Sequence, residues 1–66
     1  MFELKTKKNA EKALVTLLEG LEVAEESLSG EDIDRYKQEL RMVIKAIKEQ
    51  RIKVSEDLLK EAIAAS

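Results

Sequence analysis

Residues 10–28 read AEKALVTLLEGLEVAEESL and carry two apolar stripes that run side by side. A leucine stripe comprises Leu14, Leu18 and Leu21. A small-residue stripe lies next to it and comprises Ala13, Leu17, Gly20 and Ala24, with Leu28 continuing it. Steps of three and four residues keep side chains on one face of an α-helix. A helix in a hairpin needs only one such stripe, so the second stripe predicts another partner for this helix.

The two stripes predict two different neighbours. We expect the leucine stripe to close a hairpin with the next helix, and the small-residue stripe to recruit a second copy of the chain. Glycine in a helix interior costs about 1 kcal/mol relative to alanine, and a close approach of two helix axes at Gly20 would offset that cost. The alternative is that Gly20 marks a kink or a tolerated weak point. The predicted self-association residues are Ala13, Leu17, Gly20 and Ala24.

A second helix is predicted after residue 30. The segment Ser29-Gly30-Glu31-Asp32 resembles a capping box followed by an acidic first turn. The apolar residues that follow also step by three and four, and they are Ile33, Tyr36, Leu40, Val43 and Ile47. Only residues 28–30 separate the two helices, so we expect them to pack as an antiparallel hairpin.

The chain after Gln50 allows two interpretations. Residues 51–54 alternate between polar and apolar, and Ser55-Glu56-Asp57 has the pattern of a new helix start with acidic residues in its first turn. We therefore expect a break and a third helix. The alternative is one long helix over residues 31–65, because its apolar positions keep register with only Arg51 interrupting them. Those positions are Leu40, Ile44, Ile47, Val54 and Leu58.

The predicted fold class is all-α. The sequence has no proline and two glycines, and strong helix formers dominate it. We expect a single domain over residues 1–66, with helices at about 7–28, 31–50 and 55–65. Thr6 or Asn9 is expected to cap the first helix, and Gly30 to take the left-handed position after it. Residues 1–5 alternate through Phe2 and Leu4 and predict a frayed start, a short strand or an arm.

The size of the chain predicts assembly. A chain of 66 residues buries only about 60% of its unfolded surface, so its core supplies no more than about 3–5 kcal/mol. Small domains compensate with disulfides, metals or oligomerisation, and this sequence has no cysteine and no histidine. We therefore expect a homo-oligomeric helical bundle, either a homodimer or a larger assembly.

The charges are unevenly distributed along the chain. Residues 17–34 carry seven acidic and no basic side chains, whereas residues 35–53 carry seven basic and two acidic ones. We expect the acidic and basic stretches to face each other across the hairpin or between subunits. The alternative is that the basic stretch binds an anionic ligand.

A basic stripe on the second helix is the predicted anion site. It comprises Lys37, Arg41, Lys45 and Lys48, which share one flank of the helix. An oligomer would repeat this stripe and could sequester a nucleotide or dock RNA through phosphate contacts. Base stacking would be limited, because Phe2 and Tyr36 are the two aromatic residues of the chain.

The sequence gives little support for catalysis, so we expect a non-enzymatic protein without a metal or cofactor. It lacks histidine, cysteine and a glycine-rich phosphate loop, and Glu19, Glu22 and Glu26 flank the apolar sector as a solvated face. No apolar run approaches the roughly 18 residues that span a membrane, and a cytoplasmic location is expected. The preferred function is self-association together with binding of an unidentified protein, as an adaptor, regulator or inhibitor.

Overall fold

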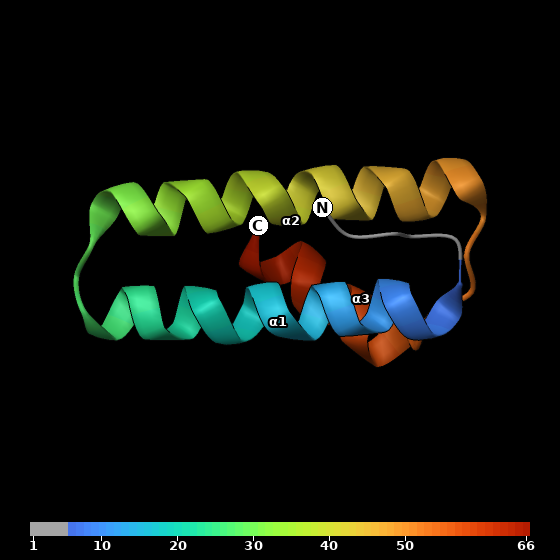
Figure 1. Ribbon diagram of the computed structural model, residues 1–66, viewed down its shortest axis with the longest axis horizontal. Coiled ribbons are helices and arrows are strands. Elements are labelled where there is room, and N and C mark those ends of the chain that lie inside the picture. Colours follow the sequence, from blue (N-terminus) through green and yellow to red (C-terminus); the bar gives the residue numbers. More distant parts are fainter. Residues whose placement is uncertain (1–5) are drawn as a thin grey trace.

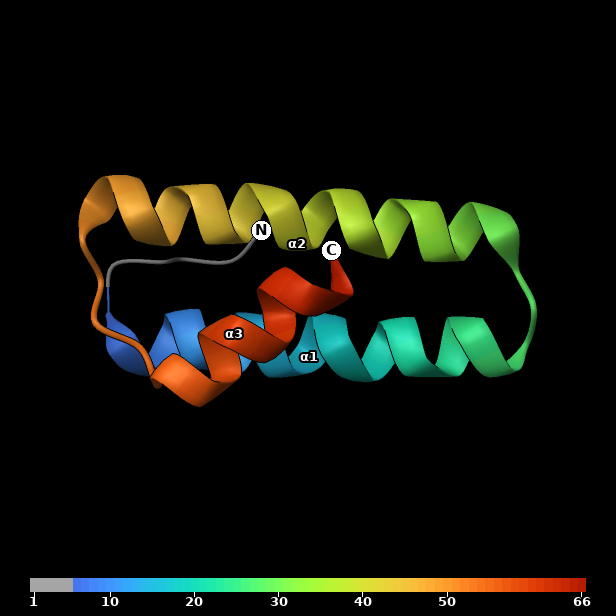
Figure 2. The same ribbon diagram turned by 180° about the vertical axis from the view of Figure 1, so that it is seen from behind.

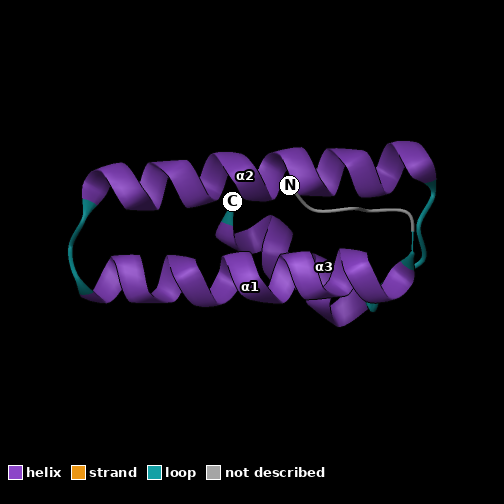
Figure 3. Ribbon diagram, in the orientation of Figure 1, coloured by secondary structure: helices purple, strands orange, loops and turns teal. Residues whose placement is uncertain are grey.

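Residues 6–66 are described by a computed structural model of the chain, and within this range the chain forms three helices and no strand (Figure 3). The helices are α1 (Lys7–Glu26), α2 (Gly30–Gln50) and α3 (Glu56–Ala65). The predicted all-α class and the break between the second and third helices are therefore confirmed. The predictions for residues 1–5 lie outside the described residues.

Helices α1 and α2 form an antiparallel hairpin that is closed by a turn at residues 27–29 (Figure 1). A link at residues 51–55 then reverses the chain, and α3 packs against both helices of the hairpin. Seen from behind, α3 crosses the half of the hairpin nearer the link, and no described helix covers the half nearer the turn (Figure 2). The hairpin is therefore covered over part of one face only.

The core is one apolar cluster shared by the three helices. Its buried members are Ala10, Ala13, Leu14, Leu17 and Leu21 of α1, Leu40, Val43, Ile44 and Ile47 of α2, and Ala62 of α3. No polar or charged side chain is buried within residues 6–66. The apolar stripe predicted for the second helix faces this core, with Ile33 and Tyr36 half-buried at its edge.

The helices begin in different ways. At α1 the prediction of a capping residue is confirmed, because the backbone N–H of Asn9 donates to Thr6 Oγ1 at 3.2 Å. Neither Ser29 nor Ser55 makes a side-chain capping bond, so the expected caps of α2 and α3 are wrong in that respect. The backbone N–H of Ser55 instead donates to Glu11 Oε2 at 2.8 Å. A carboxylate of α1 thus stands at the positive end of α3.

Helices α1 and α2 are both followed by a non-glycine residue in the left-handed region, Leu28 with φ 56° and Arg51 with φ 54°. After each, the next backbone N–H closes the helix end, from Ser29 to Ala24 O at 3.2 Å and from Ile52 to Ile47 O at 3.0 Å. The left-handed conformation costs a side-chain-bearing residue about 1–2 kcal/mol. Gly30 is the first residue of α2 and has no positive φ, so its predicted role is wrong.

Candidate functional site

Gly20 is a point of close approach between α1 and α2. A Cβ atom added to Gly20 would lie 2.6 Å from Cε1 and 2.7 Å from Cζ of Tyr36. The absence of a side chain therefore lets the ring of Tyr36 rest on the backbone of α1, and any larger residue would displace that ring. The close approach predicted at Gly20 is present, but its partner is the second helix of the same chain.

The small-residue stripe is packed inside the chain. Ala13 is fully buried, and Leu17 and Ala24 are 2% and 4% exposed. From the leucine stripe, Leu18 and Leu21 line a groove together with residues of α3. The second partner that the two stripes predict for this helix is therefore α3. Self-association stays a prediction, but in this fold it requires a surface other than the small-residue stripe.

One groove lies between α1 and α3, and we call it the acidic groove. It encloses about 330 Å³. Its apolar lining consists of Val15, Leu18, Leu21, Leu58 and Ala65. Its charged lining consists of Glu19, Glu22, Glu25 and Glu61, without a basic residue. The predicted solvated acidic face of the first helix is exposed as expected, and part of it forms the rim of this groove.

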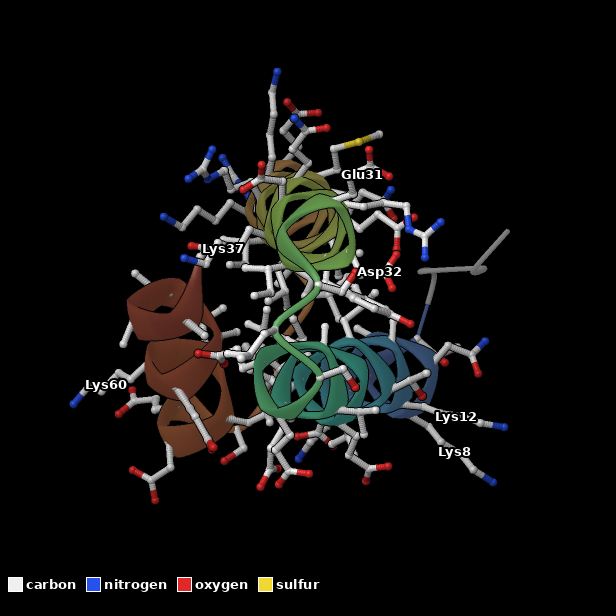
Figure 4. The ribbon with its side chains drawn as sticks, turned by 90° about the vertical axis from the view of Figure 1, so that its left-hand side faces the viewer. Lys8, Lys12, Glu31, Asp32, Lys37 and Lys60 are labelled. Atoms are coloured by element: carbon white, nitrogen blue, oxygen red, sulfur yellow. The ribbon has the colours of Figure 1, made fainter. Side chains whose placement is uncertain are left out.

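A second groove lies between α2 and α3, and we call it the basic groove. It encloses about 410 Å³ and is lined by Arg41, Ile44, Lys45, Lys48, Glu49, Ile63 and Ser66. Three of the four residues predicted as an anion site are thus brought together here. The fourth, Lys37, is half-buried outside the groove lining and extends from α2 toward α3 (Figure 4).

Part of the basic stripe already has a role inside the chain. Arg41 donates from Nη2 at 2.8 Å and from Nε at 3.2 Å to the backbone oxygen of Ser66. A guanidinium at this position complements the negative end of α3. Lys45 Nζ lies 3.9 Å from a carboxylate oxygen of Glu49, and both side chains are largely exposed. Lys48 takes part in no ion pair within residues 6–66.

Like charges gather at the two ends of the hairpin. The acidic stretch 17–34 is centred on the turn, so the acidic residues at the end of α1 lie beside Glu31 and Asp32 of α2. Both ion pairs of the described residues lie within α2, the first of them Arg35–Asp32 at 3.2 Å and the second Lys45–Glu49. The prediction that acidic and basic stretches face each other across the hairpin is therefore wrong, and pairing between subunits stays a prediction.

The charged residues at the two ends of α1 interact unfavourably with its macrodipole. The helix has no acidic residue in its first turn and no basic residue in its last turn, and it begins with Lys7 and Lys8. The amino end of a helix favours anions and its carboxyl end favours cations, so Glu25 and Glu26 also stand at the disfavoured end. Helices α2 and α3 follow the rule, with acidic residues in their first turns. Local violations of this kind are expected at functional or strained sites.

Two features of these sites were missed by sequence reasoning. One is the contribution of α3 to both grooves, which depends on where this helix docks. The other is Glu11, which lies in a lysine-rich segment of the sequence. No sequence pattern marks it as a contact for Ser55. Within residues 6–66, no group of three or more side chains has the composition and placement of a metal site.

None of the helices in the described part of the chain combines the length and apolar character needed to cross a membrane. Comparisons of this chain with models of protein families, with curated proteins and with solved structures found no match.

Proposed function

We propose that this chain is a small non-enzymatic helical protein that acts by protein–protein binding, with the acidic groove as its docking surface. The partner segment is a basic amphipathic helix, whose apolar face enters the groove and whose lysines or arginines meet the rim. The observation that carries the proposal is the combination of an apolar lining with four carboxylates and no cation. Amphipathic helices in apolar grooves are a common mode of recognition.

The two parts of the groove would contribute in different ways. The apolar lining supplies burial, since Val15 is 41% exposed and Leu18 and Leu58 are half-buried. The carboxylates set the partner's charge and speed its approach. A basic partner would also reduce the repulsion among Glu19, Glu22 and Glu25, which no basic side chain of the groove offsets. Binding would therefore relieve an unfavourable feature of the free protein.

A labelled helical peptide tests this proposal by fluorescence anisotropy. The peptide carries leucines at helical positions i, i+4 and i+7 flanked by lysines, and its counterpart carries glutamates instead. We expect the basic peptide alone to bind, and binding to weaken with salt. Glu22→Gln with Glu25→Gln should reduce binding, whereas Lys45→Gln with Lys48→Gln in the other groove should not.

Two results would contradict the proposal. One is equal binding of both peptides, which would show that the carboxylates do not select the partner. The other is no binding of the basic peptide up to about 1 mM, a concentration at which association is worth only about 4 kcal/mol.

A second candidate function is binding of a nucleotide or RNA phosphate in the basic groove. It is favoured by Arg41, whose two nitrogens already converge on an oxygen acceptor, and by Lys45 and Lys48 beside it. A thermal-shift screen with nucleotides and short RNA checks it. Stabilisation should fall with salt and vanish in the Lys45→Glu, Lys48→Glu variant, and no shift with any of these anions would exclude this function.

A further inference from the structure

The link between α2 and α3 contains nothing that forbids a helix. Residues 51–55 read RIKVS and include neither glycine nor proline, the strongest helix breakers. The link nevertheless leaves the helical conformation, and Arg51 adopts a left-handed φ of 54°. Ile52 and Val54 are half-buried and pack against the core. Contacts of Ile52 and Val54 with the core therefore contribute to holding the link in its bent form.

The apolar register of α2 continues through the link into α3. Val54 and Leu58 follow Ile47 by 7 and 11 residues, separations that return to the same face of a helix. If the link became helical, residues 30–65 would form a single helix of about 54 Å, at a rise of about 1.5 Å per residue. That helix would present one apolar face along its length.

Helix α3 is held on the hairpin by contacts that do not require it to belong to the same chain. Ala62 is its one buried residue, and Leu58, Leu59 and Ala65 are half-buried. Its two ends are fastened by side chains of the hairpin, through the bonds of Glu11 to Ser55 and of Arg41 to Ser66. The α3 of a second copy could make the same packing contacts and the same bonds to Arg41. In a continuous helix the backbone N–H of Ser55 would donate to the carbonyl of Arg51 instead of Glu11.

From these observations we propose that α3 is exchanged between two copies of the chain. The link straightens, α2 and α3 become one continuous helix, and the α3 of each copy occupies the α3 position on the hairpin of the other. The proposed occupant is a second copy, because the position already holds a helix of this sequence, whose packing and bonds to Arg41 do not depend on the conformation of the link. Exchange of an identical element is a low-cost route to a symmetric dimer.

The balance between the two forms depends on the link. The packing of α3 on a hairpin and the bonds of Arg41 to Ser66 are the same in both forms, so they cancel, whereas the bond of Ser55 to Glu11 exists in the bent form alone. The bent form keeps Ile52 and Val54 on the core but strains Arg51, whereas the straight form relieves Arg51 and brings the two links together where the helices cross. Association costs freedom of motion, so the exchanged form gains as protein concentration rises.

This inference goes beyond the proposed function and does not depend on it. In the exchanged dimer each acidic groove lies between the α1 of one copy and the α3 of the other. The groove keeps the same lining as in the single chain, so binding of the basic peptide and exchange of α3 can succeed or fail separately.

Two single-cysteine variants test the exchange. The described residues contain no free cysteine, and the sequence contains no cysteine at all. One variant carries Glu11→Cys and the other Ser55→Cys, whose native residues are joined by a hydrogen bond of 2.8 Å. The two are mixed, incubated and treated with a short bismaleimide crosslinker. We expect a crosslinked pair of twice the chain mass, in a yield that rises with protein concentration.

The matched control replaces Ser55→Cys by Lys60→Cys. The Lys60 side chain points away from the hairpin (Figure 4), so it should not crosslink with position 11 of another copy. A yield from the 11–55 mixture no higher than that of the 11–60 mixture overturns the proposal. Sedimentation of the unmodified chain provides an independent measurement, and a monomer at every concentration would also overturn it.

Substitutions of Arg51 in the link should shift the equilibrium between the bent monomer and the exchanged dimer. Arg51→Gly removes the strain of the bent form, whereas Arg51→Ala favours the straight helix. We expect the dimerisation constant of the alanine variant to exceed that of the glycine variant by at least about tenfold, because two links change in each dimer. Equal constants for both variants would contradict the exchange. If these variants stay monomeric yet bind the basic peptide, exchange is excluded and the proposed function stands.

Discussion

The turn at residues 27–29 and the link at residues 51–55 have a similar backbone conformation, but their side chains pack differently. Each follows a helix with a non-glycine residue in the left-handed region, Leu28 in the turn and Arg51 in the link. In the turn, Leu28 is 86% exposed and does not join the core. The link places Ile52 and Val54 against the core. The link is therefore anchored to the core by its own side chains, whereas Leu28 of the turn is not.

The surroundings of the two connections also differ in charge. The turn joins two acidic segments, so its neighbours repel one another, and the basic residues of the 35–53 stretch extend to the link. At the link end, Glu11 supplies a carboxylate to the start of α3. The turn has no corresponding contact from a third element, because α3 covers only the other half of the hairpin (Figure 2). The link end is thus tied to α3, whereas the turn end is not.

The largest expected change in the free energy of unfolding comes from the different packing of the link and the turn. The double substitution Ile52→Ala, Val54→Ala should lower the free energy of unfolding by about 2 kcal/mol, because two half-buried side chains lose part of their burial. Leu28→Ala should change it by less than about 0.5 kcal/mol, as is usual for an exposed residue. Urea denaturation monitored by circular dichroism gives both values. Similar losses in the two variants would contradict the comparison.

The second prediction concerns the strain that the two connections share. Leu28→Gly should raise the free energy of unfolding by about 1 kcal/mol, because glycine takes the left-handed conformation freely while its added flexibility in the unfolded chain offsets part of the gain. In a domain of this size that corresponds to a rise in Tm of about 4–8 °C. Leu28→Ala is the matched control, since alanine keeps the strain. A Leu28→Gly variant no more stable than Leu28→Ala would show that the turn stores no strain.

These two connections also show how far the sequence could predict the fold. The break before α3 was predictable, because residues 51–54 alternate between polar and apolar and Ser55-Glu56-Asp57 resembles a new start, although Val54 keeps the register of a longer helix. The residue at the left-handed position was not. The usual preference for glycine pointed to Gly30, whereas Leu28 takes the position, since a single strained residue costs little compared with the packing that the hairpin gains.

The candidate sites were predictable only where they lie on one helix. The spacing of Arg41, Lys45 and Lys48 placed them on one flank, and they do line one groove. The partner of Gly20 was not predictable, because the pattern shows a need for close approach but not whether α2 or a second chain meets it. The acidic groove could not be foreseen, since α3 contributes to it and the docking of a helix with one buried residue has little signature in sequence.

The third prediction compares the effect of charge at the turn end and at the link end of the hairpin. Glu26→Lys should raise the free energy of unfolding by about 0.5–1 kcal/mol at low salt, because it removes one carboxylate from the turn end and places a cation at the carboxyl end of α1. Lys48→Glu should lower it by a similar amount, since Lys48 is the basic residue in the last turn of α2. Thermal unfolding followed by circular dichroism checks both variants. A loss of stability in Glu26→Lys would show that the acidic turn end is not self-repelling.

The smallest expected effect concerns salt. Raising the ionic strength from about 0.01 M to about 0.15 M shortens the Debye length from about 30 Å to about 8 Å, so repulsion within the acidic turn end weakens. The two ion pairs of residues 6–66 are exposed and lie within one helix, so little attraction is lost in exchange. We expect stability to rise by about 0.3 kcal/mol, or about 1–2 °C in Tm. The gain in stability with salt should be smaller in Glu26→Lys, because that substitution has already relieved part of the repulsion. Both proteins should be measured at a concentration that keeps the chain monomeric. A Tm that falls with salt in the natural chain would mean that attraction between unlike charges outweighs the crowding of like charges at the ends of the hairpin.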